Sequence, residues 1–162
     1  VPVAWMNDLE STVAVLTLSG ALYDRSGKLI RAASEGILAG ERQRQGGLRG
    51  RALVAAGEDP TAADTRYIGQ GWTPLHFAAA AGDVELVRAL LSAGAAVDAR
   101  SVYGQTPLWW ACNVGHQRAA EVLLAAGADP NARSDEGYSP LGRVRRSDPA
   151  LAEVVSGYGG VV

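Results

Sequence analysis

The strongest constraint on the fold of this chain is a sequence segment that repeats at an interval of about 33 residues. The segment "TPLHFAAAAG" (73–82) aligns with "TPLWWACNVG" (106–115). Thr73, Thr106 and Ser139 follow one another at equal intervals, so Ser139 begins a third copy. A fixed period of this length indicates supersecondary units that fold alike and stack on one another.

A second part of the unit repeats with the same period. The segment "LVRALLSAGAAVDAR" (86–100) aligns with "AAEVLLAAGADPNAR" (119–133). In the first of these segments four apolar residues share one face of a helix: Leu86, Val87, Leu90 and Leu91. A single pair of helices cannot bury such a stripe, whereas stacked neighbours can, so the period predicts a solenoid.

The ends of each predicted helix carry residue types that favour helix starts and stops. Thr73 is expected to be an N-cap, Pro74 suits the first helical position, and Gly82 ends the helix because glycine adopts the left-handed conformation without steric cost. The aligned residues of the next copy are given the same roles. The residues assigned to these structural roles are Thr73, Pro74, Gly82, Gly94, Thr106, Pro107, Gly115 and Gly127.

The period, the tetrapeptide "TPLH" at 73–76 and the segment "GADPNAR" at 127–133 resemble ankyrin repeats over residues 69–141. The resemblance implies an all-α solenoid of stacked antiparallel helix pairs, with loops that end in β-hairpin-like tips. It also implies that His76 ties neighbouring loops together through hydrogen bonds of its ring.

The same resemblance implies a function. Ankyrin repeats bind other proteins through the loop tips and the concave helix face, and they have no catalytic chemistry of their own. We therefore expect a non-enzymatic adaptor or inhibitor, with toxin neutralisation or regulation of a partner enzyme as its narrower forms. The sequence does not identify the protein partner.

The repeat pattern divides the chain into five segments. The two clear repeats are residues 69–101 and 102–134, and residues 135–162 are a C-terminal capping repeat. Residues 24–68 are a degenerate first repeat. Residues 1–23 are an irregular N-terminal segment, in which "STVAVLTLSGAL" (11–22) is compatible with either a helix or a strand.

The two imperfect repeats still contain helical patterns. In the first, we expect a helix at "KLIRAASEG" (28–36) and a repeat end at "RALVAAGEDP" (51–60). Between them "GERQRQGG" (40–47) is polar and rich in glycine, and we interpret this insert as a flexible excursion. In the capping repeat "LAEVVSGYG" (151–159) predicts an amphipathic helix, with an apolar stripe of Leu151, Val154, Val155 and Tyr158.

The period also indicates which residues occupy the loop tips and the adjoining ends of the first helices. Each tip carries one aromatic residue, Trp72, Tyr103 or Tyr138, in a chain with only 6% aromatics. Because these residue types are enriched at binding hot spots, we expect one ridge that contacts a protein. The alternative is that each ring packs on a neighbouring loop and stiffens the stack. The predicted partner-binding residues are Ile68, Gln70, Trp72, Ala80, Ala81, Val102, Tyr103, Gln105, Asn113, Val114, Asp135, Glu136, Tyr138 and Arg146.

Residues that invite a catalytic or metal-binding interpretation are given structural ones. No cysteine or carboxylate lies at metal-ligand spacing from His76 or His116, so no metal, cofactor or catalytic residue is predicted. Trp109 takes the place of His76 in the next copy, where it fills space between repeats or, alternatively, widens the groove as an aromatic contact surface. Cys112 aligns with Ala79, at a position where small residues pack between helices.

Composition narrows the classes of function. The formal net charge of −2 gives no overall attraction for nucleic acid or an anionic membrane. The basic cluster "GRVRRSD" (142–148) is interpreted as a solvated surface able to pair with an acidic partner. The chain has only one cysteine and no run of about 18 apolar residues, so we expect a cytoplasmic protein. We also expect it to be monomeric when unbound. With Lys28 as its only lysine, it is similar to bacterial ankyrin proteins of GC-rich genomes.

Two other functions remain as alternatives. The apolar residues 11–22 lie outside the repeat and are a candidate edge for self-association. The second alternative is enzyme activity. The sequence argues against it, because it lacks a phosphate-binding loop, a nucleophile elbow and an H-E-x-x-H motif.

Overall fold

The computed structural model describes residues 27–38, 40–64, 71–144 and 148–162, and every regular element within these ranges is a helix. Residues 11–22, Ile68, Gln70 and Arg146, which the sequence singled out, lie outside the described residues. The helices are α2 (Gly27–Glu35), α3 (Glu41–Ala55), α4 (Pro74–Ala81), α5 (Val84–Ser92), α6 (Pro107–Val114), α7 (Gln117–Ala125), α8 (Pro140–Arg143) and α9 (Pro149–Gly157).

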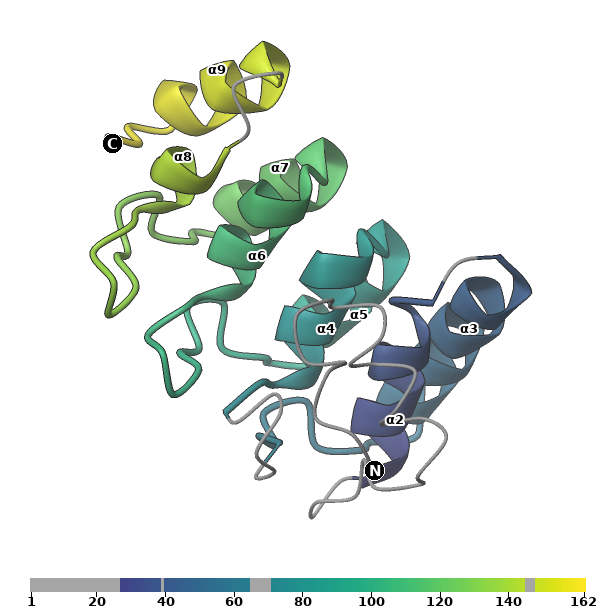
Figure 1. The fold of residues 1–162 in the computed structure, drawn as a ribbon. Coiled ribbons are helices and arrows are strands. Elements are labelled where there is room, and N and C mark those ends of the chain that lie inside the picture. The colour runs from purple at the N-terminus through teal and green to yellow at the C-terminus, as the bar shows by residue number, and fades with distance from the viewer. Residues whose placement is uncertain (1–26, 39, 65–70, 145–147) are drawn as a thin grey trace, which may run out of the picture.

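The helices pair along the chain, and the pairs stack side by side (Figure 1). The first helices α2, α4, α6 and α8 contact one another in chain order and form one layer of the stack. The second helices α3, α5, α7 and α9 do the same in the other layer. Loops project from one end of the successive pairs. This arrangement confirms the predicted all-α solenoid of helix pairs.

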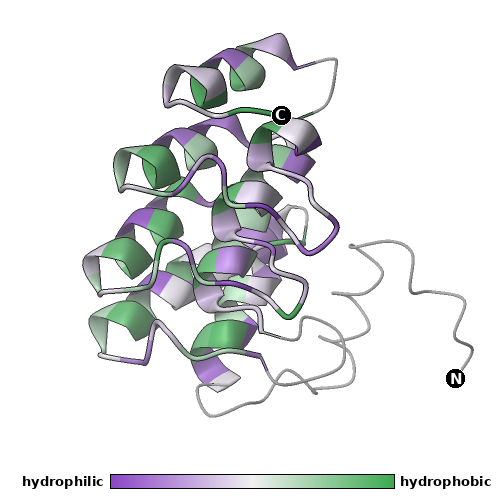
Figure 2. Ribbon diagram, turned by 90° about the vertical axis from the view of Figure 1, so that its left-hand side faces the viewer, coloured by the Kyte–Doolittle hydropathy of each residue, from purple (hydrophilic) through white to green (hydrophobic). Residues whose placement is uncertain are grey.

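Buried leucine and alanine side chains join one pair to the next. The leucines with no exposed surface include Leu75, Leu86, Leu90, Leu108, Leu123 and Leu151. Each contributes roughly 2 kcal/mol by leaving water. Figure 2 shows green, apolar stretches that recur in each helix pair along the stack. The core is therefore a continuous column rather than a separate core in each repeat.

The helix ends lie where the repeating segment indicates them. Thr106 is the N-cap of α6, and its hydroxyl oxygen accepts a hydrogen bond from the Trp109 N–H at 3.2 Å. Gly82 and Gly115 follow α4 and α6 in the left-handed conformation, with φ of 68° and 95°. A residue with a Cβ would be strained at these two positions.

The C-terminal helix differs in one respect from its predicted stripe. Leu151 and Val155 of α9 are buried, and Val154 packs against the core. Tyr158, however, is 52% exposed, so its place in the stripe was wrong. Tyr158 is already the C-cap of α9, where the chain leaves the helix and the helical period no longer directs the side chain.

The expectation of a flexible excursion at residues 40–47 is wrong, because α3 runs without interruption from Glu41 to Ala55. It has 15 residues, whereas α5 and α7 have 9 each, so the additional residues lengthen the helix. Glu41 accepts a hydrogen bond from Gln45 one turn later, at 2.8 Å. Gln43 Nε2 donates to the carbonyl oxygen of Ala81 at 3.0 Å. These contacts offset the low helix propensity of the glycines.

The glycines of α3 allow it to lie close to both neighbouring helices. A Cβ on Gly46 would lie 2.7 Å from the backbone of Glu35 and of Gly36, at the end of α2. A Cβ on Gly50 would lie 3.0 Å from the Leu86 side chain in α5. The polar, glycine-rich composition that suggested a loop instead permits tight helix packing.

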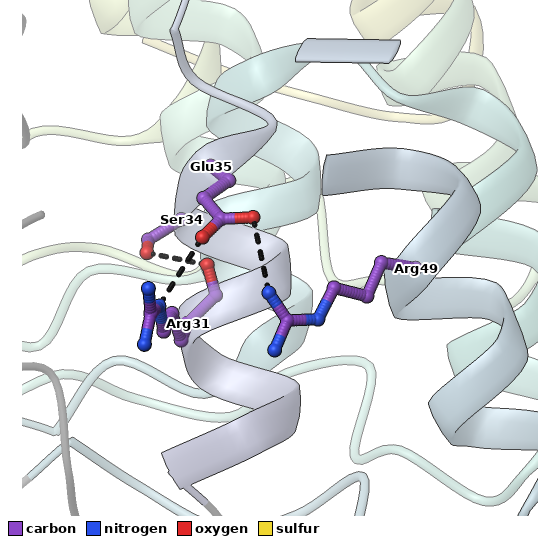
Figure 3. Close-up of polar contacts among 4 residues, drawn as sticks. All are labelled: Arg31, Ser34, Glu35 and Arg49. Carbon is purple, nitrogen blue, oxygen red and sulfur yellow. Dashed lines mark hydrogen bonds and ion pairs between the residues drawn. The ribbon is translucent and has the colours of Figure 1, made fainter. Parts of the chain in front are cut away.

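Glu35 links α2 to α3 through ion pairs (Figure 3). Its carboxylate lies 3.2 Å from Arg31 Nε within α2 and 3.8 Å from an Arg49 nitrogen in α3. The buried Ser34 hydroxyl donates to the Arg31 carbonyl oxygen at 2.9 Å. Because these pairs are partly exposed, each stabilises by about 1 kcal/mol at most. These ion pairs therefore add only modestly to the attachment of α3.

We predict that Gly46→Ala lowers the free energy of unfolding by about 1–3 kcal/mol. The new methyl group would clash with backbone atoms, which cannot move away by a side-chain rotation. The matched control is Gly157→Ala in α9, where a Cβ has no atom within 4 Å. There alanine should leave stability unchanged or raise it by up to about 1 kcal/mol. Urea unfolding of the two variants and the wild type measures both effects. Equal stability of the two variants would show that α3 does not depend on this close approach.

Candidate functional site

The second and third loop tips are tight turns closed by backbone hydrogen bonds. In the second, the Ser101 N–H donates to the Gln105 carbonyl oxygen at 3.0 Å, and the Gly104 N–H donates to the Ser101 carbonyl oxygen at 2.9 Å. In the third, the Ser134 N–H donates to the Tyr138 carbonyl oxygen at 3.0 Å. Each tip therefore has a defined shape before any partner arrives.

The two tips are also bonded to each other. The Asp135 N–H donates to the Tyr103 carbonyl oxygen at 3.0 Å. Gly104 has a φ of 69°, and a Cβ there would lie 2.5 Å from Asp135 Oδ1, so glycine allows the close approach. At the base of the loops, the Asp129 N–H donates to the Asp98 carboxylate at 3.0 Å. The tips form one connected ladder.

His76 fixes the second tip to the start of α4. Its Nδ1 accepts a hydrogen bond from the Thr73 N–H at 3.1 Å, which leaves the proton on Nε2. Nε2 then donates to the Gln105 carbonyl oxygen at 3.0 Å. Burial lowers the pKa of His76 to about 4, although the bond to Gln105 opposes this shift. The neutral ring thus ties neighbouring loops together as the resemblance implied.

Trp72 does not belong to an exposed aromatic ridge, and that expectation was wrong. Its side chain is only 6% exposed. Its ring centroid lies 4.8 Å from that of Phe77 and 4.5 Å from that of Trp110. Trp72 is covered because the next first helix, α6, supplies Trp110. Its ring packs within the stack, on side chains of α4 and α6, rather than on a neighbouring loop as the alternative interpretation had it. Tyr103 and Tyr138 are 59% and 47% exposed.

Ala80 and Ala81 were also predicted on the binding surface, and both are buried, at 3% and 5% exposed. Their carbonyl oxygens accept hydrogen bonds from His116 Nε2 and Gln43 Nε2, at 3.1 Å and 3.0 Å. Alanine at these positions serves close packing between pairs. They cannot contact a partner without a rearrangement of the stack.

The described residues that remain on the predicted surface gather at the two tips and the end of α6. Val102 is 50% exposed, and Asp135 and Glu136 are exposed at the third tip. Asn113 and Val114, at the end of α6, are partly exposed. These residues, the two tyrosines and the partly exposed Gln105 form a set that we call the tip surface. Its members are Val102, Tyr103, Gln105, Asn113, Val114, Asp135, Glu136 and Tyr138.

The sequence analysis placed Arg143 in the basic cluster 142–148 but not among the partner-binding residues; in the structure it ends α8 next to the tip surface. Its guanidinium lies between two rings, 4.9 Å from the Trp109 centroid and 5.2 Å from the Tyr138 centroid. Its Nε and Nη2 both donate to Asn113 Oδ1, at 3.1 Å and 2.7 Å. The period itself held the signal, because Arg143 lies one repeat period after Trp110 and so faces the same side of the stack.

Trp109 fills space between repeats, with 3% of its surface exposed. The Nε1 atoms of Trp109 and Trp110 are buried without a hydrogen-bond partner. A buried donor without an acceptor costs about 1–3 kcal/mol. What these two residues contribute is therefore their ring surface, which Arg143 and Trp72 use respectively.

Cys112 is a small core residue, as its alignment with Ala79 indicated. It has no exposed surface. Its burial, and to a smaller extent the negative charge of Asp148, raises the pKa of its thiol to about 12. A neutral buried thiol is neither a nucleophile nor a ready metal ligand. Across the described ranges, no group of three histidine, cysteine or acidic residues is arranged to hold a metal ion. No helix among them is long and apolar enough to cross a membrane.

A depression of about 770 Å³ lies at the opposite ends of the helices, between the α4–α5 and α6–α7 turns. Several of its polar side chains are bonded within the chain. Asp83 caps α5, Gln117 Nε2 donates to Glu121 at 2.8 Å, and His116 Nε2 bonds the Ala80 carbonyl oxygen. Burial lowers the pKa of His116 below its ordinary value. Glu85 and Arg118, which also line the depression, are exposed to solvent.

Comparisons with known proteins agree with this architecture. A family model described as ankyrin repeats in three copies matches residues 49–134. The chain is also 51% identical over 51 residues to the E3 ubiquitin-protein ligase KEG of Arabidopsis thaliana. That match covers 32% of this chain and 3% of the plant protein, so the chain spans a very small part of its relative.

Because burial lowers the pKa of His76 from 6.5 to about 4, the folded state resists a proton that the unfolded state accepts. The stability that depends on neutral His76 is fully present above pH 6.5 and is lost as the pH falls toward 4. We predict a loss of about 2 kcal/mol between pH 7 and pH 5.

Urea unfolding at the two pH values measures this loss, preferably in a His116→Gln background, where His76 is the sole histidine. The window lies above the usual pKa of carboxylates, so their titration adds little. Stability that stays flat over this range would contradict the neutral tie. So would a His76 ring that titrates near pH 6.5 by NMR.

Proposed function

The chain belongs to the ankyrin-repeat family, and on this premise we propose that it binds a protein partner through its tip surface. Ankyrin repeats generally mediate protein–protein interactions. The observation that carries the proposal is that two exposed tyrosines, Tyr103 and Tyr138, stand on hydrogen-bonded tips. A tyrosine covers a large area with little side-chain entropy to lose, so a rigid, exposed tyrosine suits a binding hot spot.

The geometry of the tips supports this role. Val102 adds a half-exposed apolar side chain beside Tyr103. The bond between Asp135 and Tyr103 holds the two tips in one orientation. Because the tips need not be ordered on binding, more of the contact energy appears as affinity.

We propose that the protein has no catalytic activity, as is typical of ankyrin-repeat domains. His76 and Cys112, the residues most readily cast as catalytic, are buried and serve packing or hydrogen bonding. The name of the plant relative describes a protein of which this chain matches 3%, so we propose no ubiquitin-ligase activity for it.

The narrower form of the proposal is an adaptor or inhibitor in the cytoplasm of a bacterium, monomeric when unbound. Toxin neutralisation and regulation of a partner enzyme are its two candidate roles. An arginine-rich composition in which Lys28 is the only lysine supports this. A net charge of −2 supports a protein partner over nucleic acid or a membrane surface.

The test is a pull-down from lysate of the source organism with three baits: the wild type, the double variant Tyr103→Ala/Tyr138→Ala, and Leu48→Ala. Leu48 is a matched control, because its apolar side chain is 54% exposed but lies within α3, outside the tip surface. We expect the wild type and the control to retain the same protein. The double variant should bind it at least tenfold more weakly, since each hot-spot tyrosine contributes about 2 kcal/mol.

Thermal melts of all three baits exclude unfolding as the cause of a loss. Equal retention by the double variant would exclude the two tyrosines as the contact surface. Retention of nothing by any bait would contradict a protein-binding role in that cell. Light scattering over a range of concentrations tests the monomer, and mass that rises with concentration would favour self-association.

A further inference from the structure

One column of side chains changes character along the stack. Phe77, Trp110 and Arg143 occupy the same position in α4, α6 and α8, each one repeat period after the last. The first is buried and the second partly buried, and both are aromatic. The third is a cation on the only one of these helices that ends at a basic residue. The residue at this position therefore changes from a buried aromatic ring in α4 to a positive charge beside the tip surface in α8.

The environment of Arg143 holds its guanidinium in one place. The rings of Trp109 and Tyr138 lie on it at 4.9 Å and 5.2 Å, which are cation–π distances. Asn113 Oδ1 accepts two of its N–H groups from one edge. Two aromatic rings and one oxygen that accepts two N–H groups orient a side chain that is otherwise among the most mobile in proteins.

The charge of Arg143 has no counter-charge in the described part of the chain. The ion pairs found there involve other arginines, namely Arg31, Arg44, Arg49 and Arg51. Asn113, its hydrogen-bond partner, is neutral, and the opposite edge of the guanidinium has no acceptor among the described residues. Partial burial between rings makes an uncompensated charge more costly than in open solvent. A carboxylate supplied from outside would relieve that cost.

Neither carboxylate of the third tip, Asp135 or Glu136, forms an ion pair with Arg143. Asp135 Oδ1 lies against Gly104 of the second tip, where a Cβ would lie 2.5 Å from it. Asp135 is thus turned toward the neighbouring loop. The free edge of Arg143 is left for a partner, and a guanidinium pairs best with the two oxygens of one carboxylate.

We infer that Arg143, held between Trp109 and Tyr138, recognises a carboxylate of an acidic segment in the protein partner. The inference rests on the proposed protein-binding function and adds the chemistry of what is bound. The partner segment lies along the end of α6 and the third tip, with an aspartate or glutamate side chain on the free edge of Arg143. The tyrosines supply apolar contact, and Arg143 selects the charge.

The experiment selects binders from a random peptide library displayed on phage, with the wild-type chain as the target. We expect aspartate and glutamate to be enriched among the selected peptides. The best peptide is then labelled, and its affinity for four proteins is measured by fluorescence anisotropy: the wild type, Arg143→Gln, Arg143→Lys and Arg88→Gln. Arg88 is an exposed arginine of α5, so its variant removes the same charge elsewhere.

We expect Arg143→Gln to weaken binding about tenfold or more, and Arg88→Gln to leave it within about twofold. Arg143→Lys keeps the charge but loses the planar fork, and should give an intermediate loss. Wild-type affinity should fall as salt is raised, and that of Arg143→Gln should fall less steeply. Equal melting temperatures of the variants separate recognition from a purely structural role of the stacked guanidinium.

Three results would overturn the inference. Selected peptides without acidic enrichment would do so, as would equal binding by Arg143→Gln and the wild type, or equal losses in the Arg143 and Arg88 variants. In each case peptides that bind through Tyr103 and Tyr138 would leave the proposed function standing. A library that yields no binder at all would count against both.

Discussion

Every pair of helices in this protein depends on its neighbours for the burial of its apolar stripe. Leu86 and Leu90 of one pair and Leu123 of the next are completely withdrawn from water only because the pairs are stacked. Alanines such as Ala79 and Ala111 keep the pairs close enough for this contact. The loops follow from the same constraint, since stacked pairs bring successive tips within hydrogen-bonding distance. The packing of the helices in the stack therefore determines the surface that the loop tips offer to a partner.

The same dependence explains why equivalent positions differ in exposure. Trp72 and Tyr138 occupy corresponding places two periods apart, yet the first is 6% and the second 47% exposed. Trp72 is followed by a first helix that carries Trp110, which covers it. Among the described residues, no further first helix follows α8, so Tyr138 meets Arg143 of its own repeat instead. Tyr138 thus contacts a cation at the position where Trp72 contacts an aromatic ring of the next repeat.

Much of the fold could be predicted from the sequence, because its determinants are local and periodic. Thr106, Gly82 and Gly115 mark helix ends by backbone geometry alone, and the period set the pairing. The failures concern contacts between repeats. The glycines of α3 were taken for a loop because their packing against α2 and α5 is a tertiary property. The sequence analysis placed Arg143 in a basic cluster but did not predict its fixed position at the candidate site, since two of the groups that hold it, Trp109 and Asn113, come from the preceding repeat.

Ordered tips and an oriented cation divide the work of recognition between affinity and selectivity. Tyr103 and Tyr138 offer apolar area that many partners could cover, so they favour tight binding with little discrimination. Arg143 adds discrimination, because an apolar or basic group placed on it would leave its partly buried charge unpaired. Its position is fixed by Trp109, itself held in the core by the stack. A substitution that loosened the stack would thus reduce the selectivity for a carboxylate before it abolished binding.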